Sequence, residues 1–437
     1  MEFSSPFKSI WVLFAIILSI SIIMNVLYFF QEDIKIADIV SNHLRFSSHN
    51  KTTFEPCANA TSPRIQSVTQ SWQPVGNRSD VFVFSAYFNK EKKAVQIVGI
   101  ALLNIKVDCI CTFTTSATAA DEDRKPVRGL LEIVPEHHSR RYSAMVIRCP
   151  VPEHIWPVSV NVTVENATAS LNITYASSER YNFTVCVPTL FGPFKNPKSI
   201  IEMVELDLLL GADRFIFYNE SITPLVNTVL EHYTKKGIVK VIPWNLPVRD
   251  IHYHGQLASI QDCLYANKKK SKFLILKDLD EFIVPHKHKN WHELLQSVHD
   301  SKHTNASAYL FRNAFFNLDF GVDVNGYERK SDSQLLHLVS MLYVWRDKSF
   351  LPARQRSKMI VLPDRVEILG IHFIWKSVKG FKEVTIDPNV AFLHHYRQWG
   401  ISKNTVKDEY MRKFADPLIQ NVNKTLSLIG LCNTTGI

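Results

Sequence analysis

Residues 273–282 read FLILKDLDEF, an apolar run followed at once by three carboxylates. Residues 273–276 have the length and composition of a fully buried strand. Negative charge beside a core strand is costly unless a cation compensates it. In open α/β sheets, ligands bind just beyond the carboxyl ends of the strands, where we expect Asp278 and Asp280 to lie. Two carboxylates that flank one apolar residue can present oxygens to a hard divalent cation and leave positions open for a diphosphate and water.

The Asp-x-Asp pattern is a weak signal by itself, because a chain with this many aspartates contains it about once by chance. A second match, Asp121-Glu122-Asp123, lies between Thr/Ala-rich and basic residues, with no strand before it. We interpret that match as a solvated loop. The strand before Asp278 is therefore what favours a metal site at Asp278 and Asp280.

The N-terminal part of the chain is predicted to anchor the protein in a membrane. Residues 10–30 are uncharged and long enough to span a bilayer. Lys8 precedes this run, and Glu32 and Asp33 follow it, so the positive-inside rule gives a single-pass type II orientation with residues 1–9 in the cytoplasm. A cleaved signal peptide is the alternative, which is disfavoured because no small-x-small cleavage site follows the run.

Features after residue 30 are typical of the lumen of the secretory pathway. The chain has 11 Asn-x-Ser/Thr sequons, all of them after the predicted span, and chance would give roughly 4–5. All seven cysteines also follow the span. An oxidising compartment permits disulfides, and the odd count leaves at least one thiol free or paired with another chain. We expect Cys109 and Cys111 to lie on one face of a strand, with each thiol bridging elsewhere.

A chain of 437 residues is longer than one core usually supports, so two folded domains are expected. Residues 31–80 are rich in Ser, Thr, Asn and Pro and are predicted to form a stem. Residues 81–180 contain short β-rich runs separated by turn residues, which predict an antiparallel β domain resembling a small sandwich. No catalytic pattern is found in this domain, and we interpret it as a scaffold or an acceptor-positioning module.

Residues 181–437 are predicted to form a domain of the α/β class. Strands are expected at 182–187, 214–218, 238–242 and 273–276, and helices at 198–210, 225–235 and 256–267. Alternating strands and helices imply right-handed crossovers and a mostly parallel sheet flanked by helices. The net charge of +9 is spread along the chain. It suits an anionic ligand such as a nucleotide diphosphate, or simply solubility, and does not indicate nucleic acid.

Several motifs, taken in order along the chain, resemble those of glycosyltransferase family 92. They are VCVPTLFG at 185–192, YHGQ at 253–256, DCL at 262–264, DLDEFIVP at 278–285, GIH at 370–372 and HYR at 395–397. The resemblance implies a GT-A fold and a type II membrane protein of the Golgi with its catalytic part in the lumen. It also implies a divalent cation, manganese, and an inverting β-1,4-galactosyltransferase that moves galactose from UDP-galactose to a glycan on a glycoprotein or glycolipid.

The resemblance also implies roles for particular residues. Asp278 and Asp280 would bind the metal, with His395 as a further ligand and Glu281 in a supporting position. An ordinary histidine pair in a polar loop is the alternative for His394 and His395. Further candidates contact the donor: Lys358 and Arg397 would neutralise the diphosphate, and His254 and Gln256 would contact the nucleotide.

Three of these four donor assignments have a structural alternative. Lys358 could belong to a solvated basic face with Arg354 and Arg356, and His254 and Gln256 could simply cap a helix. Asp262 and Cys263 are expected to be structural. Inversion also needs a carboxylate to take the proton of the acceptor hydroxyl, and three residues after the metal motif are open candidates: Asp319, Asp323 and Glu328.

Two other functions compete with this one. A hydrolase could use the same carboxylates, but no second carboxylate pair stands out at a comparable strand end. A non-catalytic glycan-binding or adhesion glycoprotein would explain the anchor and the sequons. That function leaves residues 278–285 unexplained.

Overall fold

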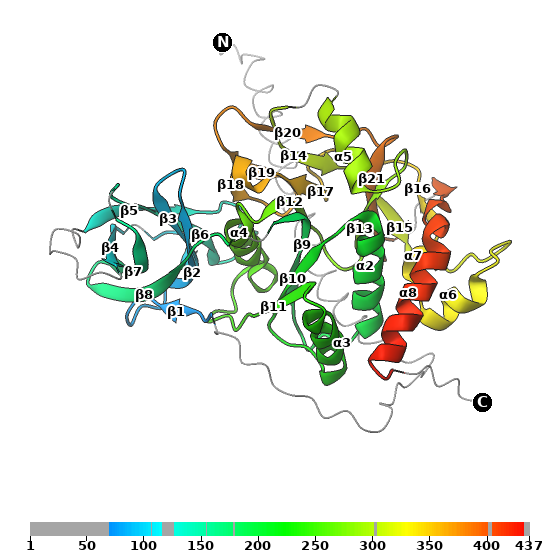
Figure 1. Ribbon diagram of the computed structural model, residues 1–437, viewed down its shortest axis with the longest axis horizontal. Coiled ribbons are helices and arrows are strands. Elements are labelled where there is room, and N and C mark those ends of the chain that lie inside the picture. The colour runs from blue at the N-terminus through cyan, green and yellow to red at the C-terminus, as the bar shows by residue number, and fades with distance from the viewer. Residues whose placement is uncertain are drawn as a thin grey trace, which may run out of the picture. The chain divides into compact units, whose positions relative to one another are not determined.

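The computed structural model describes residues 70–431, with gaps at 106, 116–125, 154, 178–179, 301–303 and 401–403 (Figure 1). The predicted cytoplasmic tail, the membrane span at 10–30 and most of the stem lie outside these residues. One prediction needs correction here, that of a single-pass Golgi membrane protein. No helix in the described part of the chain is long and apolar enough to cross a bilayer. The predicted membrane anchor and the Golgi location are not proposed further.

The first part of the chain forms one eight-stranded sheet in the order β1-β2-β3-β6-β5-β4-β7-β8. Its strands are β1 (Gln73–Pro74), β2 (Val81–Asn89), β3 (Ala94–Leu102), β4 (Cys109–Thr115), β5 (Val127–Ile133), β6 (Tyr142–Pro150), β7 (Pro157–Val164) and β8 (Ala167–Thr174). Neighbours are antiparallel, and a parallel pairing of Ala86 and Tyr87 with Ile173 and Thr174 joins β2 to β8. The predicted sandwich is wrong, because this pairing closes a single sheet on itself.

The closed sheet has its own apolar core, and one disulfide lies within it. Cys111 on β4 is bonded to Cys149 on β6. Cys109 is buried on the same side of β4 and has no disulfide partner among the described residues, so the expected bridge is confirmed for Cys111 and stays a prediction for Cys109. A Cβ on Gly129 of β5 would lie 2.8 Å from the Cys111 sulfur and 3.1 Å from that of Cys109. The absence of a side chain at Gly129 therefore makes room for both sulfur atoms.

The second part of the chain is built on a seven-stranded sheet in the order β11-β10-β9-β12-β17-β14-β20. Its strands are β9 (Tyr181–Leu190), β10 (Arg214–Asn219), β11 (Val239–Pro243), β12 (Ser271–Leu276), β14 (Ala306–Phe311), β17 (Lys358–Val361) and β20 (Lys382–Thr385). The first four strands in this order are parallel, and β17 runs antiparallel to β12 and β14. As the sequence predicts, residues 273–276 lie in the fourth strand of the alternating series, in the middle of the sheet.

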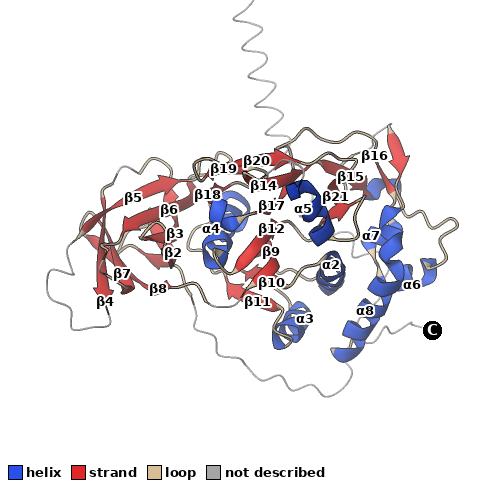
Figure 2. Ribbon diagram, turned by 45° about the horizontal axis from the view of Figure 1, so that its top comes forward, coloured by secondary structure: helices blue, strands red, loops and turns tan. Residues whose placement is uncertain are grey.

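The helices that connect the parallel strands begin and end where the sequence predicts. They are α2 (Pro197–Leu210), α3 (Pro224–Lys235) and α4 (Gln256–Asn267). The Asn196 side chain accepts a hydrogen bond from the Ser199 amide at 3.2 Å, and Gly211 ends α2 with φ of 115°. Figure 2 shows α2 and α3 on one side of the sheet and α4 on the other, where α4 packs against β3 and β6 of the closed sheet.

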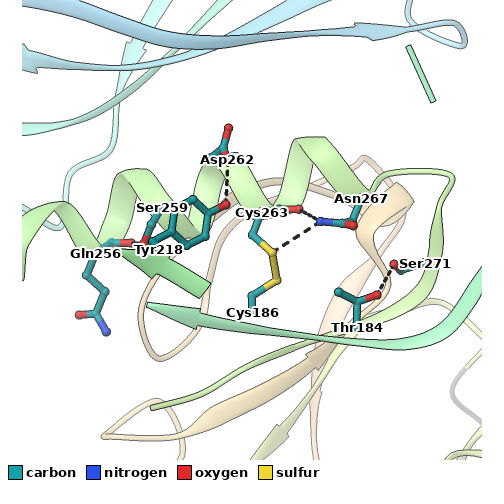
Figure 3. The surroundings of a disulfide bond; sticks show 9 residues. All are labelled: Thr184, Cys186, Tyr218, Gln256, Ser259, Asp262, Cys263, Asn267 and Ser271. Atoms are coloured by element: carbon teal, nitrogen blue, oxygen red, sulfur yellow. Dashed lines mark hydrogen bonds between the residues drawn. A yellow bond between two sulfur atoms is a disulfide. The ribbon is translucent and has the colours of Figure 1, made fainter. Parts of the chain in front are cut away.

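Helix α4 joins the closed sheet to the seven-stranded sheet through buried polar contacts. The Asp262 carboxylate accepts hydrogen bonds from the hydroxyls of Ser85, Tyr87 and Tyr218 at 2.5–2.7 Å. On the same helix, Cys263 is bonded to Cys186 of β9 (Figure 3). Asp262 and Cys263 are therefore structural, as expected. Residues from both predicted domains share one apolar cluster here, and the boundary at residues 180–181 stays a prediction.

A five-stranded sheet, which the sequence did not predict, completes the second part of the chain. It has the order β13-β21-β15-β16-β22 and is formed by β13 (Glu281–Pro285), β21 (Ala391–Arg397), β15 (Asn313–Asn317), β16 (Trp345–Asp347) and β22 (Thr405–Lys407). The remaining named elements are α5 (Trp291–Asp300), α6 (Lys330–Leu336), α7 (Val339–Leu342), α8 (Ala415–Leu428), β18 (Val366–Leu369) and β19 (Ile374–Ser377). Because β13 begins five residues after β12 ends, the carboxylates of 278–281 lie where the two sheets meet.

Candidate active site

Three strands bring charged side chains together at the carboxyl end of β12. Asp278 and Asp280 follow β12, and Glu281 begins β13. Lys358 begins β17, whose next residue pairs with the last residue of β12. His395 lies on β21, directly across from Glu281. The pairing of these strands therefore gathers residues that are separated by more than a hundred positions in sequence.

Lys358 and Glu281 form the buried base of this cluster. The Lys358 ammonium is 2.9 Å from an Asp278 oxygen and 3.2 Å from a Glu281 oxygen, and both Lys358 and Glu281 are almost fully buried. Burial would lower the pKa of Lys358, but the carboxylates of Asp278 and Glu281 raise it above its usual value. The pKa of Glu281 is raised by burial, which outweighs the opposing charge of Lys358. Since Lys358 is buried and paired, it does not belong to a solvated basic face.

Glu281 also positions its neighbours. One Glu281 oxygen accepts a hydrogen bond from the Asp278 amide at 2.9 Å, and the other lies 3.4 Å from Nδ1 of His395. The same His395 nitrogen is 3.1 Å from the Asn313 side-chain oxygen, while Nε2 is 3.5 Å from an Asp280 oxygen. A histidine that binds a metal usually donates its other ring N–H to a carboxylate or carbonyl. His395 has that arrangement, with Nε2 directed toward Asp280.

The cluster has more carboxylates than cations. With His395 neutral, as a metal ligand must be, Asp278, Asp280 and Glu281 face only Lys358 and Arg397, so one negative charge is uncompensated. Burial would raise the pKa of Asp280, but the charges of His395 and Arg397 lower it below its usual value. Asp278 and Asp280 keep about 34% and 44% of their side chains exposed. Two accessible carboxylates beside an oriented imidazole are a donor set that fits a divalent cation.

Two of the residues predicted to bind the sugar donor lie next to this cluster. His254 is in the 3-10 turn η3 (His252–Gly255), and Gln256 begins α4. Gln256 is buried and donates to Asp278 at 3.3 Å. The imidazole of His254 stacks on Phe191 at 3.9 Å and contacts a Glu220 oxygen through Nδ1 at 2.5 Å. Helix capping is not the role of His254, because the N-cap of α4 is Gly255 and Nδ1 of His254 contacts Glu220 instead.

A cavity of about 390 Å³ lies beside His254, beyond the carboxyl ends of β9, β10 and β11. Its lining includes Glu220, Arg249 and His254, together with Gly192, Pro193, Ser221, Asn245 and Leu246. Pockets of this size commonly hold small ligands, and this edge of a parallel sheet is where they bind. A larger cavity, about 550 Å³, lies at the opposite end of β12 around Ser271 and Lys272, away from the carboxylates.

The three candidate bases lie in different surroundings. Asp319 is exposed and lies two residues after the end of β15. The last residue of β15, Asn317, pairs with Arg397 of β21. Asp323 instead accepts hydrogen bonds from the Trp345 indole at 2.9 Å and from the backbone amide of Asn325 at 3.1 Å. The hydrogen bond from the Asn325 amide is the main reason that the pKa of Asp323 is lowered. Glu328 is exposed, nine residues beyond Asp319. Only Asp319 follows a strand that reaches the carboxylate edge.

Sequence reasoning missed three residues of the site. Glu220 contacts Nδ1 of His254, and Asn313 contacts Nδ1 of His395. The third is Tyr253, whose hydroxyl has a pKa raised by burial and by the charges of Asp278 and Asp280. Glu220 comes directly after β10 (Arg214–Asn219), so its position at a parallel strand end was a usable signal. The role of Asn313 depends on the pairing of β15 with β21, and sequence gave no sign of that pairing.

Comparisons with known proteins agree on the family. The model of glycosyltransferase family 92 matches residues 181–429. Two relatives from Caenorhabditis elegans are similar along most of the chain. One is the beta-1,4-galactosyltransferase galt-1, 22% identical over 80% of this chain and 81% of its own. The other is the glycosyltransferase family 92 protein F13G3.3, 21% identical over 79% of this chain and 70% of its own.

Similarity to solved structures is weaker. Glucosyl-3-phosphoglycerate synthase from Mycobacterium tuberculosis matches with 11% identity and a TM-score of 0.27, covering 58% of this chain and 82% of that chain. A likeness at this level carries no argument about donor or metal. The family model, in contrast, spans more than half of the chain, and the protein therefore belongs to glycosyltransferase family 92 and is a glycosyltransferase.

Proposed function

We propose that this glycosyltransferase moves galactose from a UDP-sugar to a hydroxyl of a glycan acceptor, with inversion at the anomeric carbon and with a bound divalent cation, manganese. The observation that supports this best is the uncompensated carboxylate charge at the end of β12. The relative named a beta-1,4-galactosyltransferase supports galactose and the β linkage. The parallel half of the seven-stranded sheet, β11-β10-β9-β12, supports a GT-A arrangement.

The donor is proposed to lie along the carboxyl ends of the parallel strands. The nucleoside would occupy the cavity beside Glu220 and His254, where Arg249 offers an exposed cation. The diphosphate would then reach Asp278 and Asp280 through the cation, which when bound stabilises the charge of the departing diphosphate. Arg397 would add a fixed positive charge there. Lys358 is held on Asp278 and Glu281, so its proposed part is to limit the repulsion among the carboxylates.

The acceptor is proposed to approach from the side of β15 and β21. Asp319 would take the proton of the attacking hydroxyl, because it is exposed at the edge where Arg397 lies. The sugar passes through an oxocarbenium-like transition state as the bond to the diphosphate breaks and the new glycosidic bond forms on the opposite face. The glycan could be carried by a glycoprotein or a glycolipid.

A donor and acceptor array tests this function. The purified chain is incubated with manganese, labelled UDP-sugars and glycans, and transfer is measured for wild type, Asp280→Asn and Asp364→Asn. Asp364 is a matched aspartate at the opposite end of β12, paired with Lys269. We expect transfer from UDP-galactose by wild type and Asp364→Asn, and none by Asp280→Asn. Transfer from a different UDP-sugar would correct the identity of the donor. The proposal would be refuted if none of the UDP-sugars binds.

A further inference from the structure

A second group of metal-binding side chains lies behind the candidate active site. His286 follows β13, His394 lies on β21, and Asp408 follows β22. One ligand atom from each of the three residues lies within 4.8 Å of the others. The closest pair is Nε2 of His286 and Nε2 of His394, which are 2.9 Å apart. His394 and His395 are neighbours on one strand, so their side chains point to opposite faces and belong to different sites.

Two of the three residues, His394 and Asp408, have a partner that leaves a ligand atom available. Nδ1 of His394 is 3.4 Å from the Tyr396 hydroxyl, so its Nε2 faces His286. The Asp408 carboxylate accepts hydrogen bonds from Arg346 at 2.8 Å and from the Tyr410 amide at 3.2 Å. Each carboxylate oxygen has a second lone pair. Supporting contacts of this kind are what orient the ligands in metal sites.

Aromatic rings hold the two imidazoles in place. His286 stacks between Phe392 and Tyr410 at 4.3 and 4.1 Å, and His394 stacks on Phe316 at 4.3 Å. These contacts restrict rotation of both histidines. The pair is therefore ordered before any ligand binds, which lowers the entropic cost of binding.

We propose that His286, His394 and Asp408 bind a zinc ion. Zinc takes nitrogen and oxygen ligands in tetrahedral geometry, with a water free to complete the set. Nitrogens about 2.0–2.1 Å from a tetrahedral zinc lie about 3.3 Å apart, so the two imidazoles need to separate by only a few tenths of an ångström. Imidazole ligands select zinc over manganese or magnesium, which prefer oxygen. This site therefore differs in kind from the carboxylate cluster.

Two cations lie near the proposed site and oppose ion binding. Arg346 is neutralised by Asp408 itself, and Lys413 donates to the Tyr410 hydroxyl. The zinc would cross-link three segments of the fold. It ties the segment after β13 to β21 and to the segment after β22, and β21 carries His395 and Arg397 on its other face.

Zinc binding by the full-length chain tests the proposal. All proteins carry Asp280→Asn, so that zinc binding at the carboxylate cluster is weakened. Zinc is removed with a chelator, and its rebinding is measured by equilibrium dialysis against a competing chelator. The test variant is His286→Gln, and the matched control is His288→Gln, a histidine on the same segment outside the cluster. Circular dichroism confirms that each protein is folded.

We expect one zinc per chain in the parent and in His288→Gln, and binding at least about tenfold weaker in His286→Gln. X-ray absorption of the parent, which does not depend on any variant folding, should show two imidazole ligands. Equal zinc affinity in His286→Gln would show adventitious metal only. No zinc in the parent would leave the two imidazoles as a hydrogen-bonded pair, and either outcome overturns the proposal.

Discussion

Two clusters of charged side chains in this protein have opposite charge balances. At the carboxylate cluster, with His395 neutral as a metal ligand must be, Asp278, Asp280 and Glu281 face two cations, Lys358 and Arg397. At the cluster around Glu367 of β18, that carboxylate contacts three cations: Lys92 between β2 and β3, Arg148 on β6 and Lys376 on β19. Glu132 of β5 shares Lys376.

The difference separates a functional cluster from a structural one. Burial would raise the pKa of Glu367, but Lys92 and Arg148 lower it to about 2, so this carboxylate is fully compensated by protein groups. Glu281, by contrast, has a raised pKa because burial and neighbouring carboxylates outweigh the opposing charge of Lys358. The cluster around Glu367 needs no further cation, and its ion pairs join the closed sheet to the β18–β19 pair. A cluster that lacks one is where a cation is expected to bind.

The largest expected effect is on stability, from Lys358→Met. This change leaves the buried Glu281 carboxylate without its cation, and removal of one partner of a buried pair costs about 3–5 kcal/mol. Chemical denaturation measures the free energy of unfolding. Arg354→Met is the matched control, because Arg354 forms an exposed pair with Glu383 and surface pairs contribute at most about 1 kcal/mol. Equal losses in the two variants would contradict the buried role of Lys358.

The next effect is on catalysis, from Asp280→Asn. The variant keeps the shape of the side chain and removes one of the three negative charges of the carboxylate cluster. We expect kcat to fall by about 10²–10³-fold, the usual loss when one group that stabilises transition-state charge is removed. The free energy of unfolding should change little, because the Asp280 side chain is about 44% exposed. A variant that folds normally and retains full turnover would remove Asp280 from the site.

A smaller effect is expected for Glu367→Gln, and it should depend on pH. Because the folded state lowers the pKa of Glu367 from 4.5 to about 2, its stabilisation is present above pH 4.5 and is lost as the pH falls toward 2. We expect a loss of about 2–3 kcal/mol at pH 7 and much less at pH 3. Denaturation at both pH values measures this, with Glu91→Gln as the exposed control. An unchanged loss at pH 3 would contradict the ionic origin.

Local sequence signals predicted much of the fold. The alternation of strands and helices predicted β9 to β12 and α2 to α4, because each carries its own periodicity and caps. Closure of the first sheet could not be predicted, since it depends on two residue pairs between β2 and β8. The five-stranded sheet was also missed, because its strands are short and pair with partners distant in sequence.

The candidate site was predicted in part for the same reason. Asp278 and Asp280 follow a strand that is visible in the sequence, and the family motif added His395. The buried state of Lys358 and the role of Asn313 depend on how β17 and β15 pair, which no local pattern records. The alternative interpretation of His394 and His395, an ordinary pair in a polar loop, is wrong. They are buried on β21 and face two different sites.

Manganese binding to three full-length proteins tests the central claim, that uncompensated carboxylate charge makes the site. Wild type, Asp280→Asn and Glu367→Gln are titrated with manganese by isothermal calorimetry in the presence of UDP. We predict that wild type and Glu367→Gln bind one manganese with the same affinity and that Asp280→Asn binds it at least about tenfold more weakly. Equal manganese affinity in wild type and Asp280→Asn would contradict the claim.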